Sequence, residues 1–285
     1  EQIAYNRIDS VKSIPKSFFS DYSFLDTRVN LNDNLSITAP IAMYHFSRVE
    51  GHALDFGVFV DDAFNRRFNS SLKLSYGFSD KKFKQDFSAG YLLGDYRTWE
   101  VKFRAFNKLK ILFEESDNYG ELLSTAVTLI AKEEFRDYYY TKGFEIGIEG
   151  EVIPVLTMRA RFKNQTDKSA FVNTDFSFFN RDKEYNVNPS IYETRINSLN
   201  IGFDIDFRDY IEDGFFRRRT SLGRSYVLFS GDVTYSNPDF LGSELNFTTY
   251  EASASAFIRT FKSAFMNINL YGRLTDGVTP YQDLY

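Results

Sequence analysis

The chain has 285 residues, of which 43% are hydrophobic, and its formal net charge is −5 at pH 7. No stretch approaches the roughly 18 consecutive apolar residues that a membrane helix needs, so the sequence excludes a helical membrane protein. The negative charge argues against nucleic acid as a partner. With no cysteine and only His45 and His52, the chain has little for zinc binding or imidazole catalysis, and we expect both histidines to be structural.

Aromatic residues are the unusual feature of the composition. The chain contains 31 Phe and 19 Tyr but a single Trp. One environment that favours such an excess is a β-sheet surface that faces lipid. The other is a soluble β-sandwich with an aromatic core, so the order of the residues has to decide between them.

The first fifty residues lack alternation, and residues 1–46 are predicted to be a periplasmic lead-in or linker. Within them, the apolar stretch 18–25 either lies on a membrane surface or packs against the end of a barrel. The chain opens at Glu1 without a charged and apolar leader. We therefore expect it to be an internal piece of a longer chain, although a leader that has been removed would look the same.

From residue 51 onward, apolar and polar side chains alternate in segment after segment, which predicts β-strands. Between 199 and 208, for example, Leu199, Ile201, Phe203, Ile205 and Phe207 alternate with Asn200, Gly202, Asp204, Asp206 and Arg208. The predicted strands lie near 51–60, 68–78, 83–93, 99–105, 144–152, 156–163, 199–208, 227–235, 245–260 and 266–274. Their length of about ten residues is what a tilted membrane strand needs.

Two stretches interrupt the strands. Apolar residues from Leu122 to Phe135 recur at helical spacing, which predicts a helical insertion that Asp117 or Asn118 caps. The alternative is another strand through 124–132. The polar stretch 164–195 is predicted to be a long loop, whereas most other connections are short turns, an asymmetry typical of membrane barrels.

These patterns predict an all-β protein: an antiparallel transmembrane β-barrel with about ten visible strands and a short helical insertion. The lead-in spans 1–46 and the barrel 47–285. Because strand edges must pair somewhere in the hydrocarbon layer, we also expect these strands to be part of a larger barrel.

The polar face carries nine charged residues that we expect to face the lumen. They are Glu145, Glu149, Glu151, Arg159, Arg161, Lys163, Asp204, Asp206 and Arg208. A three-residue loop at 153–155 would pair Glu151 with Thr157, Glu149 with Arg159 and Glu145 with Lys163, and opposite charges across strands stabilise a sheet. The alternative is an ordinary solvated face.

Three other sets of charged residues could have either a functional or a purely structural role. The period-2 carboxylates could act as acid and base, but lumen lining is the better interpretation. Asp61 and Asp62 could bind calcium, although a solvated turn is favoured. The basic run 217–219 could touch anionic lipid head groups, or it is a charged loop tip. We therefore expect no catalytic residue, no cofactor and no metal, and we expect the chain not to be an enzyme.

Four segments carry a resemblance to a known family. They are 45–51 (His-Phe-Ser-Arg-Val-Glu-Gly), 74–83 (Leu-Ser-Tyr-Gly-Phe-Ser-Asp-Lys-Lys-Phe), 134–144 (Glu-Phe-Arg-Asp-Tyr-Tyr-Tyr-Thr-Lys-Gly-Phe) and 271–281 (Tyr-Gly-Arg-Leu-Thr-Asp-Gly-Val-Thr-Pro-Tyr). Together they resemble a Bacteroidota outer-membrane family of unknown function, whose members carry a carboxypeptidase-regulatory-like domain before the barrel. That barrel is similar to those of the BamA/TamA-like surface-antigen superfamily. Barrels of that superfamily continue with several more strands, so the resemblance implies that the barrel 47–285 is truncated at its C-terminus.

The resemblance implies a location in the bacterial outer membrane and a role in outer-membrane protein biogenesis or translocation. The partners it implies are outer-membrane lipid and client polypeptides. A passive pore for small solutes is an alternative based on the mixed charges of the polar face. A structural barrel that anchors a missing periplasmic domain is another. The sequence leaves these functions open.

Overall fold

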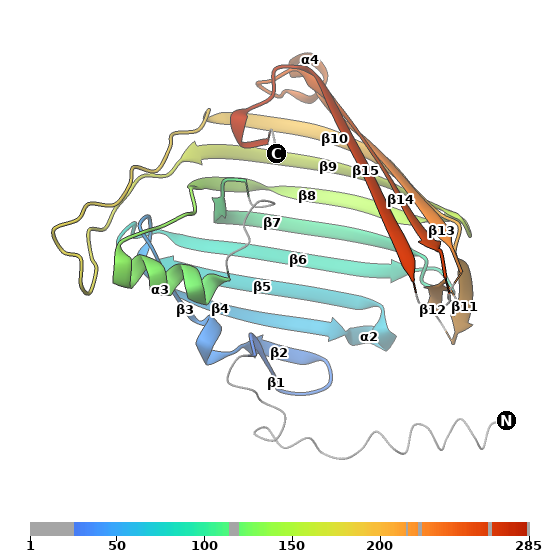
Figure 1. The fold of residues 1–285 in the computed structure, drawn as a ribbon, viewed down its shortest axis with the longest axis horizontal. Coiled ribbons are helices and arrows are strands. Elements are labelled where there is room, and N and C mark those ends of the chain that lie inside the picture. Colours follow the sequence, from blue (N-terminus) through green and yellow to red (C-terminus); the bar gives the residue numbers. More distant parts are fainter. Residues whose placement is uncertain (1–25, 114–119, 215, 222–223, 262–263, 284–285) are drawn as a thin grey trace.

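The computed structural model describes residues 26–113, 120–214, 216–221, 224–261 and 264–283. It confirms the all-β class (Figure 1). The molecule consists of one antiparallel sheet of thirteen strands and a separate two-stranded hairpin. The order of the main path is β1-β2-β4-β5-β6-β7-β8-β9-β10-β13-β14-β15, and β3 pairs beside β2 on the same edge of β4.

The strands are β1 (Arg28–Asn30), β2 (Leu35–Thr38), β3 (Tyr44–Ser47), β4 (Gly51–Asp62), β5 (Phe68–Gly77), β6 (Phe83–Leu93), β7 (Trp99–Ile111), β8 (Tyr138–Ile153), β9 (Leu156–Ser169), β10 (Thr194–Asp206), β11 (Asp209–Asp213), β12 (Phe216–Thr220), β13 (Tyr226–Ser236), β14 (Phe247–Arg259) and β15 (Phe265–Gly277). The helices are η2 (Pro40–Ala42), α2 (Ala63–Arg66), α3 (Glu121–Ala131), α4 (Pro238–Leu241) and η4 (Tyr281–Asp283). No helix among the described residues combines the length and the apolar character required to cross a membrane.

All ten strands expected from alternation are present. The structure adds five short ones that alternation did not predict, β1, β2, β3, β11 and β12, of three to five residues each. Such short segments contain too few side chains to show a period of two. Three of them, β1 to β3, fall in the stretch that the sequence assigned to the lead-in, while the apolar stretch 18–25 lies outside the described residues.

The predicted helical insertion is confirmed as α3, which excludes a strand through 124–132. Its N-cap is Gly120, and neither Asp117 nor Asn118 is among the described residues. The loop expected over 164–195 is shorter than predicted, because β9 continues to Ser169 and β10 begins at Thr194. Here the polar residues of both strands pair across the ladder, as Asn164 does with Asn197, so polarity alone misplaced the strand ends.

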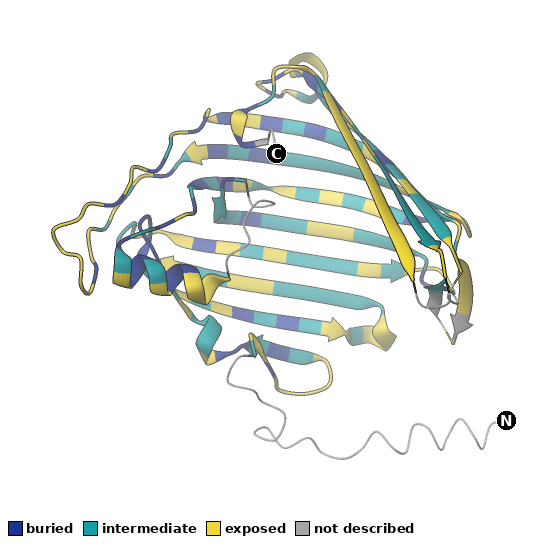
Figure 2. Cartoon of the chain, viewed as in Figure 1, coloured by how far each residue is buried: buried dark blue, intermediate teal, exposed yellow. Residues whose placement is uncertain are grey.

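The sheet is curved but open, so the expected closure into a barrel is not observed. Among the described residues, β15 pairs only with β14, and the opposite edge is formed by the short strands β1 and β3. Closure would require β15 to pair along its length with that edge, and strands of three and four residues are too short to match it. Figure 2 shows β15 exposed along nearly its whole length.

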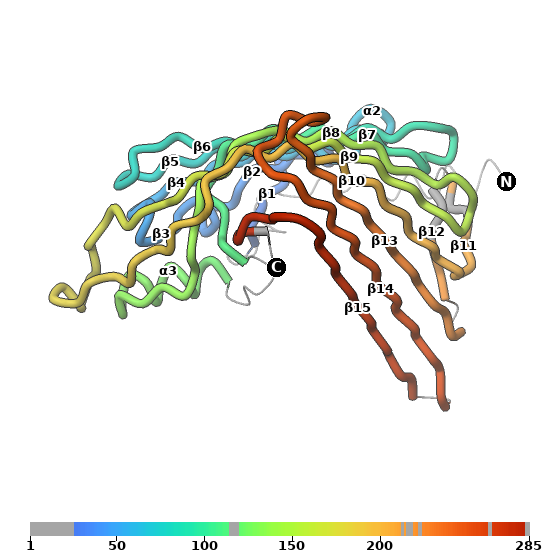
Figure 3. The backbone as a smooth tube through the Cα atoms, turned by 90° about the horizontal axis from the view of Figure 1, so that it is seen from above, coloured from blue at the N-terminus to red at the C-terminus, as the bar shows by residue number. Residues whose placement is uncertain are grey.

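The sheet forms an arch, and α3 and the C-terminal segment lie on its concave side (Figure 3). The Nε2 of Gln282, in that segment, donates to Oδ2 of Asp167 at 3.2 Å. The face of β9 that includes Asp167 is therefore the concave face. It also includes Arg159, Arg161 and Lys163, because side chains two apart share a face of a strand.

The convex face is apolar across the sheet, from β4 to β15. Its exposed large side chains include Leu54, Phe56, Leu72, Phe87, Phe103, Ile146, Ile148, Met158, Ile201, Phe203, Phe229, Val233, Tyr250, Ile268 and Leu270. Buried apolar clusters instead gather at the α3 end of the sheet. In one of them Phe46 of β3 packs with Leu129 of α3 and Tyr185 of the loop between β9 and β10.

Candidate functional site

The predicted charged face is built by three neighbouring strands and one adjoining residue. Glu145, Glu149 and Glu151 lie in β8, Arg159, Arg161 and Lys163 in β9, and Asp204 and Asp206 in β10, which Arg208 follows. The predicted register of the β8–β9 hairpin is confirmed: Glu145 lies opposite Lys163, Glu149 opposite Arg159 and Glu151 opposite Thr157. Those of the side chains that lie in β8, β9 and β10 point to the concave side of the arch.

The predicted ion pair between Glu149 and Arg159 is wrong, although the two residues face each other. Arg159 turns toward β10 and β13, where it forms an ion pair with Asp204 and two hydrogen bonds with Asp232, from Nε at 2.8 Å and from Nη2 at 2.5 Å. Glu149 instead contacts Lys102 of β7, with 3.2 Å between Oε2 and Nζ. The guanidinium donates to both oxygens of Asp232 and also pairs with Asp204, which gives it more charge-assisted hydrogen bonds than the single carboxylate of Glu149 would.

Gly202 makes the Arg159 bridge possible. It lies in β10 between Arg159 of β9 and Asp232 of β13. A Cβ atom at Gly202 would stand 2.2 Å from Oδ1 of Asp232 and 2.6 Å from Nε of Arg159. A glycine inside a strand often marks such a close approach, and this was the signal in the sequence for a side chain crossing β10.

The basic run 217–219 lies in β12, at the end of the arch away from α3 (Figure 1). Of its three side chains, that of Arg219 is described. Its Nε stands 3.9 Å from Oδ2 of Asp206, which also pairs with Arg208 at 2.7 Å. Arg219 is therefore anchored to the base of the β11–β12 hairpin.

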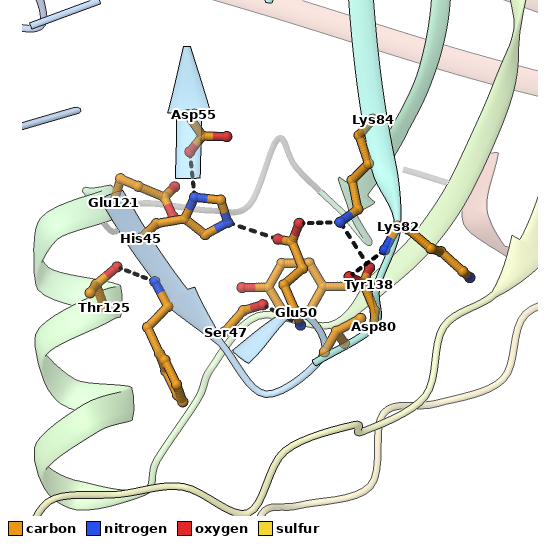
Figure 4. A network of polar contacts seen from close by, with 12 residues as sticks. His45, Ser47, Glu50, Asp55, Asp80, Lys82, Lys84, Glu121, Thr125 and Tyr138 are labelled. Atoms are coloured by element: carbon orange, nitrogen blue, oxygen red, sulfur yellow. Dashed lines mark hydrogen bonds and ion pairs between the residues drawn. The ribbon is translucent and has the colours of Figure 1, made fainter. Parts of the chain in front are cut away.

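A second charged cluster, which the sequence did not predict, lies at the α3 end (Figure 4). Lys84 of β6 is 5% exposed and stands 2.6 Å from Oε1 of Glu50 and 2.8 Å from Oδ2 of Asp80. Glu50 in turn contacts Nε2 of His45 at 2.7 Å, and Asp55 contacts Nδ1 at 2.5 Å. We call these five residues the His45–Lys84 cluster.

His45 is held as an imidazolium ion in this cluster. Burial alone would lower its pKa, but hydrogen bonds to Asp55 and Glu50 outweigh it and raise the pKa from 6.5 to about 10. Burial raises the pKa of Glu50, but the contacts with His45 and Lys84 prevail and lower it. Both ring nitrogens of His45 then donate to carboxylates, so the ring has no lone pair for a metal or a proton. The ring thus joins the side chains of Glu50 and Asp55.

A pocket of about 510 Å³ adjoins the cluster, and His45, Glu50, Asp55 and Lys84 are among the residues that line it. Within the described residues, no three His, Asp or Glu side chains are placed to hold a metal ion. His52 lies apart from the pocket, where its Nδ1 is 2.9 Å from the hydroxyl of Tyr44 and its ring packs on Phe46 and Phe176.

Arg48 forms a second buried centre beside the cluster. It is 1% exposed, and its guanidinium contacts the carboxylate of Asp137 and the carbonyl oxygen of Glu134, the latter at 3.3 Å. Its backbone N–H donates to Oε2 of Glu134 at 2.7 Å, while Tyr138 donates its hydroxyl to Oε1 at 2.5 Å. Asn188, from the loop between β9 and β10, accepts from Arg48 at 3.3 Å.

Because of Glu134, the free energy of unfolding should fall as the pH rises from about 5 to about 6.5. Burial raises its pKa from 4.5 to about 7, against its hydrogen bond from Tyr138. The folded state therefore holds this proton more tightly, and the stabilisation is present below pH 4.5 and lost as the pH rises through about 7. We expect a loss on the order of 2 kcal/mol over this window, and almost none in Glu134→Gln.

Urea unfolding followed by the fluorescence of Trp99, the single tryptophan, measures this loss. The contribution of His45 is fully present below its ordinary pKa of 6.5 and is lost only as the pH rises toward about 10. The chosen window therefore isolates Glu134. Equal pH slopes for the natural protein and Glu134→Gln would contradict the assignment.

Three of the four segments that suggested a family resemblance meet in these two centres. Segment 45–51 supplies His45, Arg48 and Glu50; segment 74–83 supplies Asp80, with Lys84 just beyond it. Segment 134–144 supplies Glu134 and its neighbours. The fourth segment lies elsewhere, where the ring of Tyr281 packs on Phe113 with 5.1 Å between centroids. Three stretches far apart in sequence thus build one charged, buried junction.

Residues 16–272 match the C-terminal domain of a family of unknown function, DUF5686. The chain belongs to this family. The match includes β1 to β14 and β15 as far as Gly272, and thus both charged centres. It supports the expectation of a family of unknown function and gives no evidence for a relationship to the BamA/TamA-like superfamily. No curated protein matches the chain.

Proposed function

We propose that this DUF5686 domain forms the wall of a β-barrel in the bacterial outer membrane and takes part in the insertion or translocation of other outer-membrane polypeptides. The observation that supports the membrane location is the two-sided sheet. Leu54, Ile201 and Leu270 are 51%, 50% and 65% exposed on a convex face that is apolar from β4 to β15. Lipid removes the cost that water would impose on so broad an apolar surface.

The unpaired edge of β15 supports the role in handling polypeptides. β15 forms a continuous ladder with β14 on one side, from Phe265 to Gly277, while none of the described strands pairs with its other side. The N–H and C=O groups along the outer edge of a sheet are a template for adding another strand. A client strand that paired there would extend the sheet and satisfy those groups inside the membrane.

Electrophoretic mobility tests the membrane location. In outer-membrane fractions, this protein should migrate differently in a gel with and without boiling. The reason is that detergent does not unfold a closed barrel until it is heated. A soluble product without a mobility shift would contradict the proposal and favour a soluble sandwich. In that case the apolar faces would pack against each other.

Cysteine crosslinking tests the role of β15. The natural chain has no cysteine, so one introduced thiol is the only one. Asn269→Cys in β15 should crosslink to newly made outer-membrane proteins, and the matched control Ala160→Cys in β9, which is paired on both sides, should not. Depletion of the protein should also lower the amounts of these clients. Absence of both effects would contradict the biogenesis role.

A passive pore for small solutes is the second candidate, and the mixed charges of the concave face favour it. Cations and carboxylates alternate there, as in Lys102 beside Glu149 and Arg159 beside Asp204. A wall of this kind attracts water and small polar solutes. Stable single-channel conductance of the purified protein in planar bilayers, together with unchanged client amounts on depletion, would favour the pore over the biogenesis role.

A further inference from the structure

A second pocket, of about 430 Å³, lies on the concave face and extends from β7 to β15. The C-terminal segment contributes Thr279 and Gln282 to its wall, consistent with the place of that segment under the arch (Figure 3). The pocket is separate from both charged centres described above. Its volume is within the range of about 300–1,000 Å³ that is usual for small-molecule sites.

The pocket has a surplus of positive charge. Its wall contains four cationic side chains and two carboxylates, so two positive charges are not matched within it; these residues are Lys110, Arg161, Lys163, Arg273, Glu145 and Glu251. Glu251 is already engaged by Arg273, with 3.2 Å between Oε1 and Nε. The surplus is local, because the whole chain has a net charge of −5.

Arg161 is the centre of this surplus. Among the described residues, its guanidinium forms no ion pair, and its buried Nε has no hydrogen-bond partner. Arg161 interacts with Asp232 at longer range, but that carboxylate is bound by Arg159. Arg159, two residues earlier on the same face, holds Asp204 and Asp232. The side chain of Arg161 lies over Gly147 of β8, where a Cβ would stand 2.6 Å from its Cγ.

Lys110 is the second cation without a carboxylate among the described residues. Its Nζ lies 5.7 Å from the centre of the Tyr139 ring, the one contact of that ammonium group that the structure defines. Buried or half-buried cations on a sheet are normally paired, as Lys84 is with Glu50 at 2.6 Å. Two unpaired cations on the wall of one pocket therefore indicate a ligand of opposite charge.

The rest of the wall indicates what accompanies that charge. It is rich in amides and hydroxyls, such as Gln165, Asn200 and Gln282. The amide N–H groups of Asn200 and Gln282 donate within the protein, but Oδ1 of Asn200 and Oε1 of Gln282 have no partner among the described residues. These two oxygens can accept hydrogen bonds from the hydroxyl groups of a polar molecule. The planar guanidinium of Arg161 matches the two oxygens of a carboxylate or a phosphate.

We propose that this pocket binds an oxyanion, a carboxylate or a phosphate, attached to a small hydroxyl-bearing molecule. Arg161 binds the oxyanion, Lys110 adds a second positive charge, and the amides bind the hydroxyls. The site does not depend on the proposed role in biogenesis or on the membrane location. It can therefore be tested on the folded full chain in detergent.

Titration calorimetry with four probes tests the class of ligand. The probes are inorganic phosphate, glucose 6-phosphate, gluconate and glucose. We expect binding of glucose 6-phosphate or gluconate, weaker binding of inorganic phosphate, and no binding of glucose. Which of the first two probes binds more tightly shows whether the site prefers a phosphate or a carboxylate. Absence of binding by every anion, or equal binding of glucose, would overturn the proposal.

Substitutions test the residues. Arg161→Gln should weaken binding of the better probe at least about tenfold, because a charge-assisted hydrogen bond is lost. Arg161→Lys should recover part of the loss, and Lys110→Gln provides a second, independent variant. The matched control is Lys73→Gln, which removes an exposed cation of the concave face outside this pocket. Both variants should have the same unfolding temperature as the unsubstituted protein, which shows that they are folded. Unchanged affinity in both Arg161→Gln and Lys110→Gln would then overturn the site.

Discussion

Arg159→Glu should destabilise the sheet by about 1–3 kcal/mol, less than the cost of breaking a fully buried ion pair, because the side chains of Asp204 and Asp232 are 43% and 20% exposed. The side chain of Arg159 is 14% exposed, and its guanidinium joins β9 to β10 and β13 through Asp204 and Asp232. A glutamate there would place three carboxylates together on the concave face. Urea unfolding in detergent, followed by the fluorescence of Trp99, gives the loss directly.

A charge swap identifies the true partner. Asp232→Arg in the Arg159→Glu background should restore much of the stability, because it reverses the bridge that the structure shows. Glu149→Arg in the same background should restore little, because Glu149 contacts Lys102 and not Arg159. Rescue by Glu149→Arg alone would mean that the cross-strand pair expected from the sequence is the real one.

Lys84→Gln should cost about 3 kcal/mol or more. It would leave Glu50 and Asp80 as neighbouring carboxylates without the ammonium that separates them at 2.6 Å and 2.8 Å. Lys84 is 5% exposed, so water compensates little for the loss. The same unfolding measurement applies, and the matched control is Lys81→Gln, three residues earlier and exposed, which should cost little.

A double variant shows whether the effect comes from this ion pair. Lys84→Gln combined with Glu50→Gln should lose less stability than the two single changes added together, because the second change removes a carboxylate that the first left unpaired. Additive losses would argue that Lys84 acts through packing and not through its charge.

Alternation in the sequence was enough to predict the strands because each one has an apolar face and a polar face. Phe203, flanked by Gly202 and Asp204, typifies the pattern, and the ten strands predicted in this way are present. The register of the β8–β9 hairpin also followed from the sequence, since a short loop leaves one way to pair Glu149 with Arg159. Helical spacing predicted α3 for the same local reason.

The partners of the charged groups did not follow from the sequence. Arg159 reaches two strands, and whether it turns toward β8 or β10 depends on the space above Gly202, which exists only in the assembled sheet. The His45–Lys84 cluster joins a tight hairpin, a turn and a strand from separate parts of the chain. No spacing along the sequence signals such contacts, because burial decides them.

The sequence by itself determined the all-β class, the ten long strands, the α3 insertion and the two faces of the sheet, because these depend on the order of neighbouring residues. The tertiary structure decided that the described sheet is open, that the short strands β1 to β3 complete one edge, and which carboxylate each cation binds. Those features depend on how residues far apart in the chain share space and exclude water. A periodic pattern does not contain that information.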